Sequence, residues 1–215
     1  MKEDIEELVS HVQSFEYEST ISETVRSDTY DLLKSICLEK DWCIIEQNYS
    51  WNLAETAAVG IPMEMFFLFM GTATYMQNIG KNGTAVKVLE ALCTYSRKRA
   101  NINHKEVIVR AISQIGGDSP EAVCRIGDAE QPLFTDDTSL YAGYFYWFYG
   151  NSLQNLGRAE DAMHAFEQCL QIRKNSLGEE NYYTELAKRG WAICEFSCSR
   201  GRKGREELLL SLIHI

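Results

Sequence analysis

Apolar side chains recur along most of this chain at intervals of three and four residues. The clearest stripes are Ala85, Leu89 and Leu92, and Ala162, Phe166 and Leu170. Such spacing places apolar side chains on one face of an α-helix, with polar residues on the other faces. The pattern predicts amphipathic helices packed side by side, and only 3 prolines interrupt the chain, which favours long helices over a many-turned β fold.

The first 55 residues carry the same helical pattern without a motif that we can name. One stripe is formed by Ile5, Leu8, Val9 and Val12, and a second is formed by Tyr30, Leu33, Ile36 and Cys37. Residues 1–55 are therefore predicted to be a helical region. It is either a divergent repeat or a cap that covers the open face of the next helices, as solenoids require for solubility.

A short segment between two helical patterns occurs twice. Residues 77–81 read QNIGK, residues 154–158 read QNLGR, and an alanine follows five residues after each glycine. Gly80 and Gly157 permit a tight reversal of the backbone, and the small Ala85 and Ala162 allow two helices to approach closely. Each copy is therefore predicted to be an antiparallel helix pair.

Two further copies are less regular. Residues 112–122 resemble a degenerate member, with Ser119 as N-cap and Pro120 at the first helical position. Another copy is predicted in residues 191–209, with its reversal at Gly201–Arg202 or at Gly204–Arg205. Spacings of roughly 40 residues between copies are typical of helical solenoids.

Charge and cysteine content narrow the choice of partner and compartment. The net charge of −10 and pI of about 4.9 argue against nucleic acid and anionic membranes as partners, because both bind basic surfaces.

The seven cysteines lie within apolar helical patterns, as in proteins of the reducing cytosol. The acidic N-terminus does not resemble a targeting peptide, and no uninterrupted apolar stretch is long enough to span a membrane. We expect a cytoplasmic protein.

Residues 147–170 resemble a tetratricopeptide repeat (TPR), whose signature positions are matched by Gly150, Gly157, Ala162 and Phe166. The repeat spacing of about 44 residues exceeds the usual 34, and residues 177–181 resemble the junction between repeats in the kinesin-light-chain-like subclass. The resemblance implies an all-α superhelix over residues 56–209.

The resemblance also implies a concave groove lined by the first helix of each pair. The implied groove residues are Tyr144, Trp147, Asn151, Gln154 and Asn155 in the best repeat, Lys188, Trp191 and Glu195 in the next, and Phe67, Met70, Thr74, Gln77 and Asn78 in the first. Aromatic anchors and amides of this kind suit a peptide backbone. The alternative for the aromatic run 144–149 is core packing. Residues on one helix point in all directions, so some of the run must be core and some exposed.

Catalytic and metal motifs are incomplete. Gly80–Lys81 lacks the upstream glycine and following hydroxyl residue of a phosphate loop. Cys194 and Cys198 are spaced to share a metal, but no second pair of ligands accompanies them. His164 and Cys169 point to different sides of one helix. We expect no enzymatic activity, no cofactor and no metal.

The sequence therefore favours a scaffold or adaptor that binds a protein or peptide partner in its groove. One alternative is the regulatory N-terminal arm of a larger enzyme or signalling receptor, and another is self-association as a homo-oligomer through an open last repeat. We interpret residues 210–215 as a translated sequencing-library adapter and the chain as a fragment that ends near Leu209. A native apolar helix end is the alternative for these residues.

Overall fold

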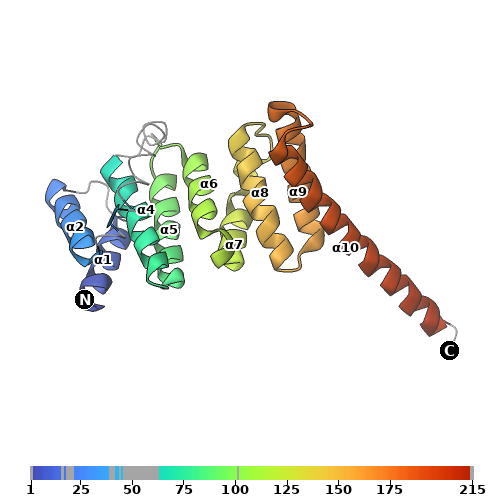
Figure 1. Cartoon of the computed structure of the whole chain (residues 1–215), viewed down its shortest axis with the longest axis horizontal. Helices are drawn as coiled ribbons and strands as arrows, with labels where there is room; N and C mark the ends of the chain where they lie inside the picture. The colour runs from blue at the N-terminus through green and yellow to red at the C-terminus, as the bar shows by residue number, and fades with distance from the viewer. Residues whose placement is uncertain are drawn as a thin grey trace. The chain divides into compact units, whose positions relative to one another are not determined.

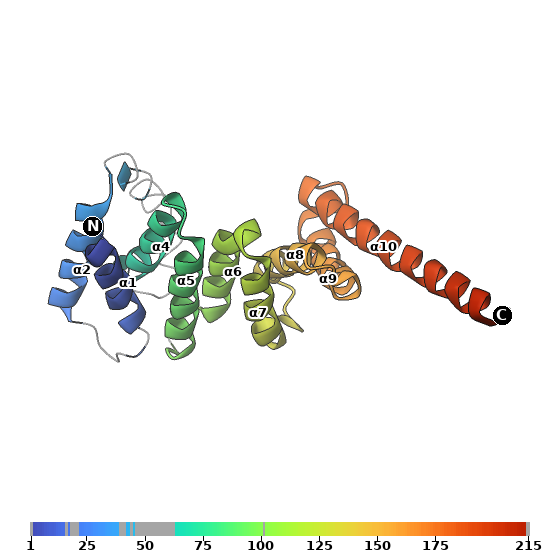
Figure 2. The same cartoon turned by 90° about the horizontal axis from the view of Figure 1, so that it is seen from below.

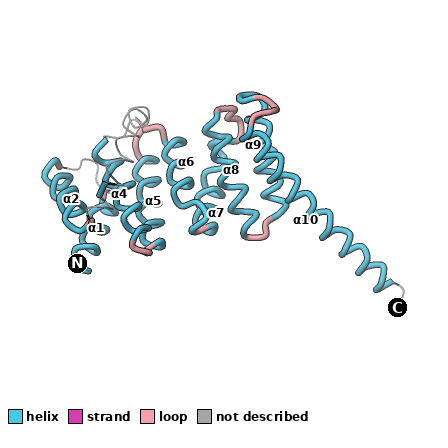
Figure 3. The backbone as a smooth tube through the Cα atoms, viewed as in Figure 1, coloured by secondary structure: helices cyan, strands magenta, loops and turns pink. Residues whose placement is uncertain are grey.

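The computed structural model describes residues 2–15, 17, 22–38, 42, 43, 45, 63–100 and 102–213, with only the backbone described for 63, 64 and 201–213. Within these residues the chain is helical and contains no strand (Figure 3). The predicted all-α class is confirmed. The chain divides into two compact units, Met1–Ser119 and Pro120–Ile215. The predicted boundary between residues 55 and 56 lies outside the described residues.

The first unit contains five described α-helices and a short 3-10 turn (Figure 1). They are α1 (Lys2–Ser14), α2 (Glu23–Ile36), α4 (Met63–Asn78), α5 (Asn82–Arg97), α6 (His104–Ile115) and η1 (Gly116–Asp118). The two N-terminal stripes do form helices, and α1 packs against α2, α4 and α5. Phe15 and Phe69 meet edge to face in this core, with ring centroids 6.0 Å apart.

The second unit begins at Pro120, where a helix start was predicted. Its elements are α7 (Pro120–Glu130), η2 (Gln131–Phe134), α8 (Leu140–Asn155), α9 (Ala159–Leu177) and α10 (Tyr182–Ile213). Ser139 caps α8, since its side chain accepts a hydrogen bond from the backbone N–H of Ala142. Helix α8 packs against α7 and α9, and α10 packs against α9.

Both predicted glycine reversals are confirmed. Gly80 joins α4 to α5 and Gly157 joins α8 to α9, each with φ +74°. At each turn the residue after the glycine donates its backbone N–H to a carbonyl five residues earlier: Lys81 N to Met76 O at 2.7 Å, and Arg158 N to Leu153 O at 2.9 Å. The shared QNxG segment therefore encodes one reversal geometry, in which only glycine adopts the left-handed backbone at little cost.

Phe166 of α9 is the central packing residue of the second unit. Its fully buried ring lies between Gly150 of α8 and Gly190 of α10. A Cβ atom would lie 3.2 Å from the ring at Gly150 and 2.7 Å at Gly190. The missing side chains at these glycines thus let α8 and α10 approach the same aromatic ring.

The reversal predicted at Gly201–Arg202 or Gly204–Arg205 is wrong. Helix α10 runs without a break from Tyr182 to Ile213, and Figures 1 and 2 show it as one continuous ribbon. A lone glycine costs a helix interior only about 1 kcal/mol. After Gly201, Arg202 and Lys203 would place positive charges in the first turn of a new helix, where the helix dipole disfavours them.

Candidate functional site

The predicted groove residues of the best repeat share one face of α8. Tyr144 is 40% exposed, Asn155 is exposed, and the others are half-buried. The helical period places residues 144, 147, 151, 154 and 155 within one arc of α8. Lys188 is exposed on α10 and Trp191 is half-buried. We call the surface formed by Tyr144, Trp147, Asn151, Lys188 and Trp191 the aromatic face.

Arg173 of α9 lies beneath the aromatic face and was not predicted. Only 3% of its surface is exposed, and its guanidinium carbon lies 4.9 Å from the ring centroid of Trp147 and 5.8 Å from those of Tyr144 and Tyr183. One guanidinium nitrogen donates to the carbonyl oxygen of Tyr183 at 2.8 Å. Three aromatic rings from α8 and α10 therefore surround one cation.

No carboxylate of the described residues lies within ion-pairing distance of Arg173. Cation–π contacts and one hydrogen bond stabilise the guanidinium in part. A guanidinium carries five N–H donors, and buried charges are normally paired. Because Arg173 uses one guanidinium nitrogen in the described hydrogen bond, it retains donors for an anionic acceptor. The sequence signal was available: Arg173 follows Cys169 by four residues and interrupts the apolar stripe of α9.

Trp147 serves the core and the aromatic face at once. Its ring meets Phe166 edge to face at 5.7 Å between centroids and also lies over Arg173. Asn151 donates its side-chain amide to the carbonyl oxygen of Trp147 at 2.7 Å, which leaves its own carbonyl oxygen for a ligand. Lys188 lies 3.4 Å from Glu185. The aromatic run thus divides as predicted, with Phe145, Tyr146 and Tyr149 buried and Tyr144 exposed.

The corresponding residues of the first repeat are largely occupied by contacts within their own unit. Gln77 of α4 donates to the carbonyl oxygen of Gln114 at 2.9 Å, and Gln114 of α6 donates to Thr74 at 3.0 Å. Phe67 is buried against Trp42 and Tyr30. These contacts join α2, α4 and α6, so the side chains of Phe67, Thr74 and Gln77 are less available to a peptide than those of the aromatic face.

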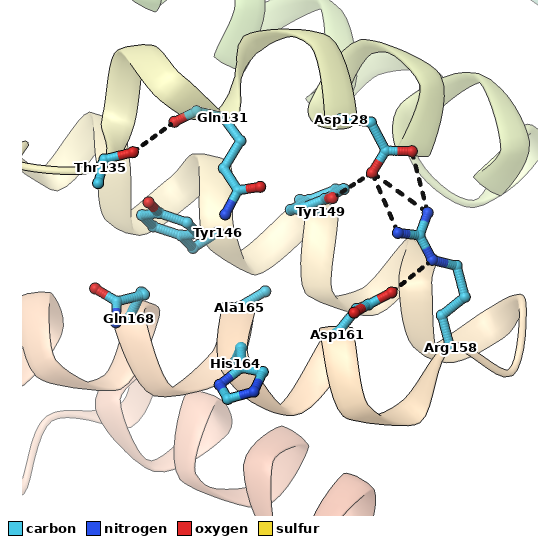
Figure 4. A pocket seen from close by; sticks show the side chains of 10 residues that line it. All are labelled: Asp128, Gln131, Thr135, Tyr146, Tyr149, Arg158, Asp161, His164, Ala165 and Gln168. Atoms are coloured by element: carbon cyan, nitrogen blue, oxygen red, sulfur yellow. Dashed lines mark hydrogen bonds and ion pairs between the residues drawn. The ribbon is translucent and has the colours of Figure 1, made fainter.

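A separate pocket of about 470 Å³ opens between α7, η2 and α9, and Tyr146 and Tyr149 of α8 line it between them (Figure 4). One wall carries the polar side chains of Asp128, Gln131 and Thr135, and the facing wall carries those of Asp161, His164 and Gln168. The remaining lining residues are Tyr146, Tyr149, Ala165 and Arg158. No local pattern in the sequence predicts this pocket, because it depends on the approach of segments about 30 residues apart.

Arg158 closes one end of the pocket by binding two carboxylates. It lies 3.1 Å from Asp128 and 2.8 Å from Asp161, and Tyr149 donates its hydroxyl to Asp128. Burial acts to raise the pKa of Asp128, but hydrogen bonds from Arg158 and Tyr149 outweigh it and lower that pKa. Burial and the bond to Asp128 raise the pKa of Tyr149 well above its usual value, so its phenol keeps its proton near neutral pH.

The sequence also offered no prediction of a close contact between a serine hydroxyl and a histidine imidazole in the first unit. Ser96 and His104 lie 2.7 Å apart, but Ser96 is buried and also donates its hydroxyl to the carbonyl oxygen of Cys93. Burial lowers the pKa of His104 to about 4, with a smaller contribution from Arg97. The pair therefore has neither substrate access nor a histidine of suitable basicity. In the described part of the chain, no three His, Cys, Asp or Glu side chains are placed to hold a metal ion.

Fold and site together define an all-α protein of packed helices with an aromatic face around a buried arginine and a polar pocket. Among the described helices, none is long and apolar enough to cross a membrane. Comparisons with protein-family models, curated proteins and solved structures found no match to this chain.

Proposed function

We propose that this chain is a cytosolic interaction scaffold, a TPR-type superhelix that binds a partner peptide along the aromatic face. The resemblance of residues 147–170 to a TPR supports this role. The observation that carries it is Arg173, a buried cation beneath three aromatic rings with no carboxylate partner in the described structure. All seven cysteines are free thiols, which is consistent with a reducing compartment.

The partner segment is expected to carry a carboxylate. A carboxylate that reaches Arg173 would use its remaining donors in charge-assisted hydrogen bonds, which are about twice as strong as neutral ones. Tyr144 and Trp147 would supply apolar area beside it, and the free carbonyl oxygen of Asn151 could accept a backbone N–H. Aromatic residues and a desolvated arginine are the usual anchors of a peptide interface.

The test is to pan the full chain against a random peptide library that includes free C-terminal carboxylates. The wild type is expected to enrich acidic peptides, and Tyr144→Ala is expected to lose them. Tyr141→Ala is the matched control, because Tyr141 lies on α8 with 41% exposure against 40% for Tyr144, whereas the described rings around Arg173 are those of Tyr144, Trp147 and Tyr183.

A second set of variants addresses the arginine and the core. Arg173→Gln should abolish acidic enrichment, whereas Lys174→Gln, which removes the adjacent half-buried charge that pairs with Glu179, should not. The double variant Trp147→Ala, Asn151→Ala should lose capture. Because Trp147 also packs against Phe166, circular dichroism is measured beside it, and a parallel loss of helicity would show that the core and not the aromatic face is affected. Equal enrichment by the wild type and Arg173→Gln would refute the proposal, provided that both proteins are folded.

Self-association is a second candidate, favoured by two apolar side chains that α10 leaves exposed. Ile193 is 52% exposed and Phe196 is 64% exposed, and their spacing of three residues places them on one side of the helix. Sedimentation of the full chain at rising concentration tests this candidate. A dimer that Phe196→Ser dissociates supports it, and a monomer at all concentrations refutes it.

A further inference from the structure

The pocket of Figure 4 borders a side of α8 that the helical period places away from the aromatic face. Tyr146 and Tyr149 line the pocket, and each follows a residue of the aromatic face, Tyr144 or Trp147, by two positions. Two positions on an α-helix are separated by about 200° around the axis. The pocket is therefore a second surface, independent of the proposed peptide site.

Its two walls repeat one polar pattern. One wall presents Asp128 followed three residues later by Gln131, and the other presents Asp161 followed seven residues later by Gln168; both spacings keep the carboxylate and the amide on one helical face. Figure 4 shows these walls facing each other, with Tyr146 and Tyr149 between them. Each wall thus offers a carboxylate toward one end and an amide toward the other.

The polar groups of the pocket keep unused acceptors. Arg158 contacts both carboxylates, but its bond to Asp161 uses only Oδ2, so Oδ1 of Asp161 has no partner among the described residues. The side-chain amides of Gln131 and Gln168 likewise form no hydrogen bond in the described structure. A ligand with several donors would therefore find acceptors on both walls.

The charge of the pocket selects a cation. Asp128 and Asp161 face a single Arg158, which leaves one net negative charge, and Asp136 and Asp137 lie close enough to act on Tyr146. Burial raises the pKa of Tyr146, and the negative charges of Asp136 and Asp137 raise it further. The bound guanidinium of Arg158 also shows that these carboxylates accept planar cationic donors.

We propose that this pocket binds an arginine or lysine side chain of a partner protein, with the cationic end at Asp161 and the rest of the bound residue within reach of Gln131 and Gln168. The volume of about 470 Å³ accommodates a long basic side chain. The aliphatic stem would lie over Tyr146 and Ala165 while the charged end reaches the walls. This site, on the side of α8 away from Arg173, would recognise a basic residue of the partner.

The experiment titrates isotope-labelled full chain with N-acetyl-arginine methylamide and N-acetyl-lysine methylamide, followed by NMR. N-acetyl-citrulline methylamide is the control ligand, because it has nearly the same shape as the arginine probe without its charge. Saturable shifts are expected for the side-chain amides of Gln131 and Gln168 with a cationic probe. Equal binding of the citrulline probe would overturn the proposal.

Variants locate the site and separate it from general attraction to an acidic protein. Asp161→Asn and Gln168→Ala should each weaken binding about threefold, as expected for partly exposed polar contacts. Glu160→Gln removes the adjacent charge on α9, which does not line the pocket, and should change binding little. An equal loss in Asp161→Asn and Glu160→Gln would show nonspecific attraction and refute the site.

Two further measurements test whether the pocket binds a free small cation instead of a side chain, and whether it depends on the aromatic face. Agmatine carries the same guanidinium without a peptide unit; saturable binding of agmatine with none of the amino-acid amides would contradict a partner side chain. Tyr144→Ala should leave the titration unchanged, so failure of the peptide-binding proposal and failure of this one are distinguishable.

Discussion

Gly190→Ala tests how α8, α9 and α10 are held together. The new Cβ would lie 2.7, 2.8 and 2.9 Å from three atoms of the Phe166 ring, closer than carbon atoms pack. The ring cannot retreat freely, because the Cβ position at Gly150 is already 3.2 Å from it on α8. Overpacking of this kind costs about 1–3 kcal/mol, whereas alanine in a helix gains about 1 kcal/mol over glycine.

The net expectation is a loss of up to about 2 kcal/mol in the free energy of unfolding, measured by urea denaturation. Ser197→Ala is the control in the same helix, because Ser197 is exposed and alanine should gain about 0.5 kcal/mol there. The decisive variant adds Phe166→Leu, whose smaller side chain should relieve the clash. If the cost of Gly190→Ala is the same in both backgrounds, the clash with Phe166 is not its cause.

Three further predictions concern the turn, a buried histidine and the thiols. Gly157→Ala should lose about 1–2 kcal/mol in urea denaturation, because φ +74° is left-handed. The pKa of His104 is lowered to about 4, so the unfolded chain takes up a proton at a higher pH than the folded chain. The free energy of unfolding should therefore fall as the pH drops from about 6.5 towards 4. His104→Gln should flatten this pH dependence, and an unchanged slope would contradict the assignment. Exposed Cys43 should react with a thiol reagent before buried Cys169, whose pKa burial raises to about 12; equal rates in the folded protein would contradict the burial.

Much of the helical architecture was predictable because it depends on local signals. The QNxG segments contain a residue that tolerates the left-handed backbone, and the alanine five positions later marks the packed face of the next helix. Gly201 and Gly204 were misassigned because glycine alone does not end a helix. The charge of the residues that follow Gly201 was the better guide.

The binding surfaces were less predictable because they combine residues from several helices. Family resemblance placed Tyr144 and Trp147 on one face of α8, but it gave no role to Arg173, which approaches from α9. The pocket required the approach of α7 and α9, which no local pattern encodes. A charged residue within an apolar stripe, such as Arg173, was the one overlooked signal.

The aromatic run of α8 explains how one helix can support two surfaces. Phe145, Tyr146 and Tyr149 are almost completely buried, and these large side chains fix the rotation of α8 about its axis. Trp147 is fixed in turn against Phe166. Tyr144 lies on one side of α8 and Gln168 lies across the pocket on the other side, and they share no contact within the described structure. For a partner that occupies both surfaces, the losses of binding free energy caused by Tyr144→Ala and Gln168→Ala should therefore add in the double variant. A coupling above about 0.5 kcal/mol would mean instead that α8 moves as one body when either surface is occupied.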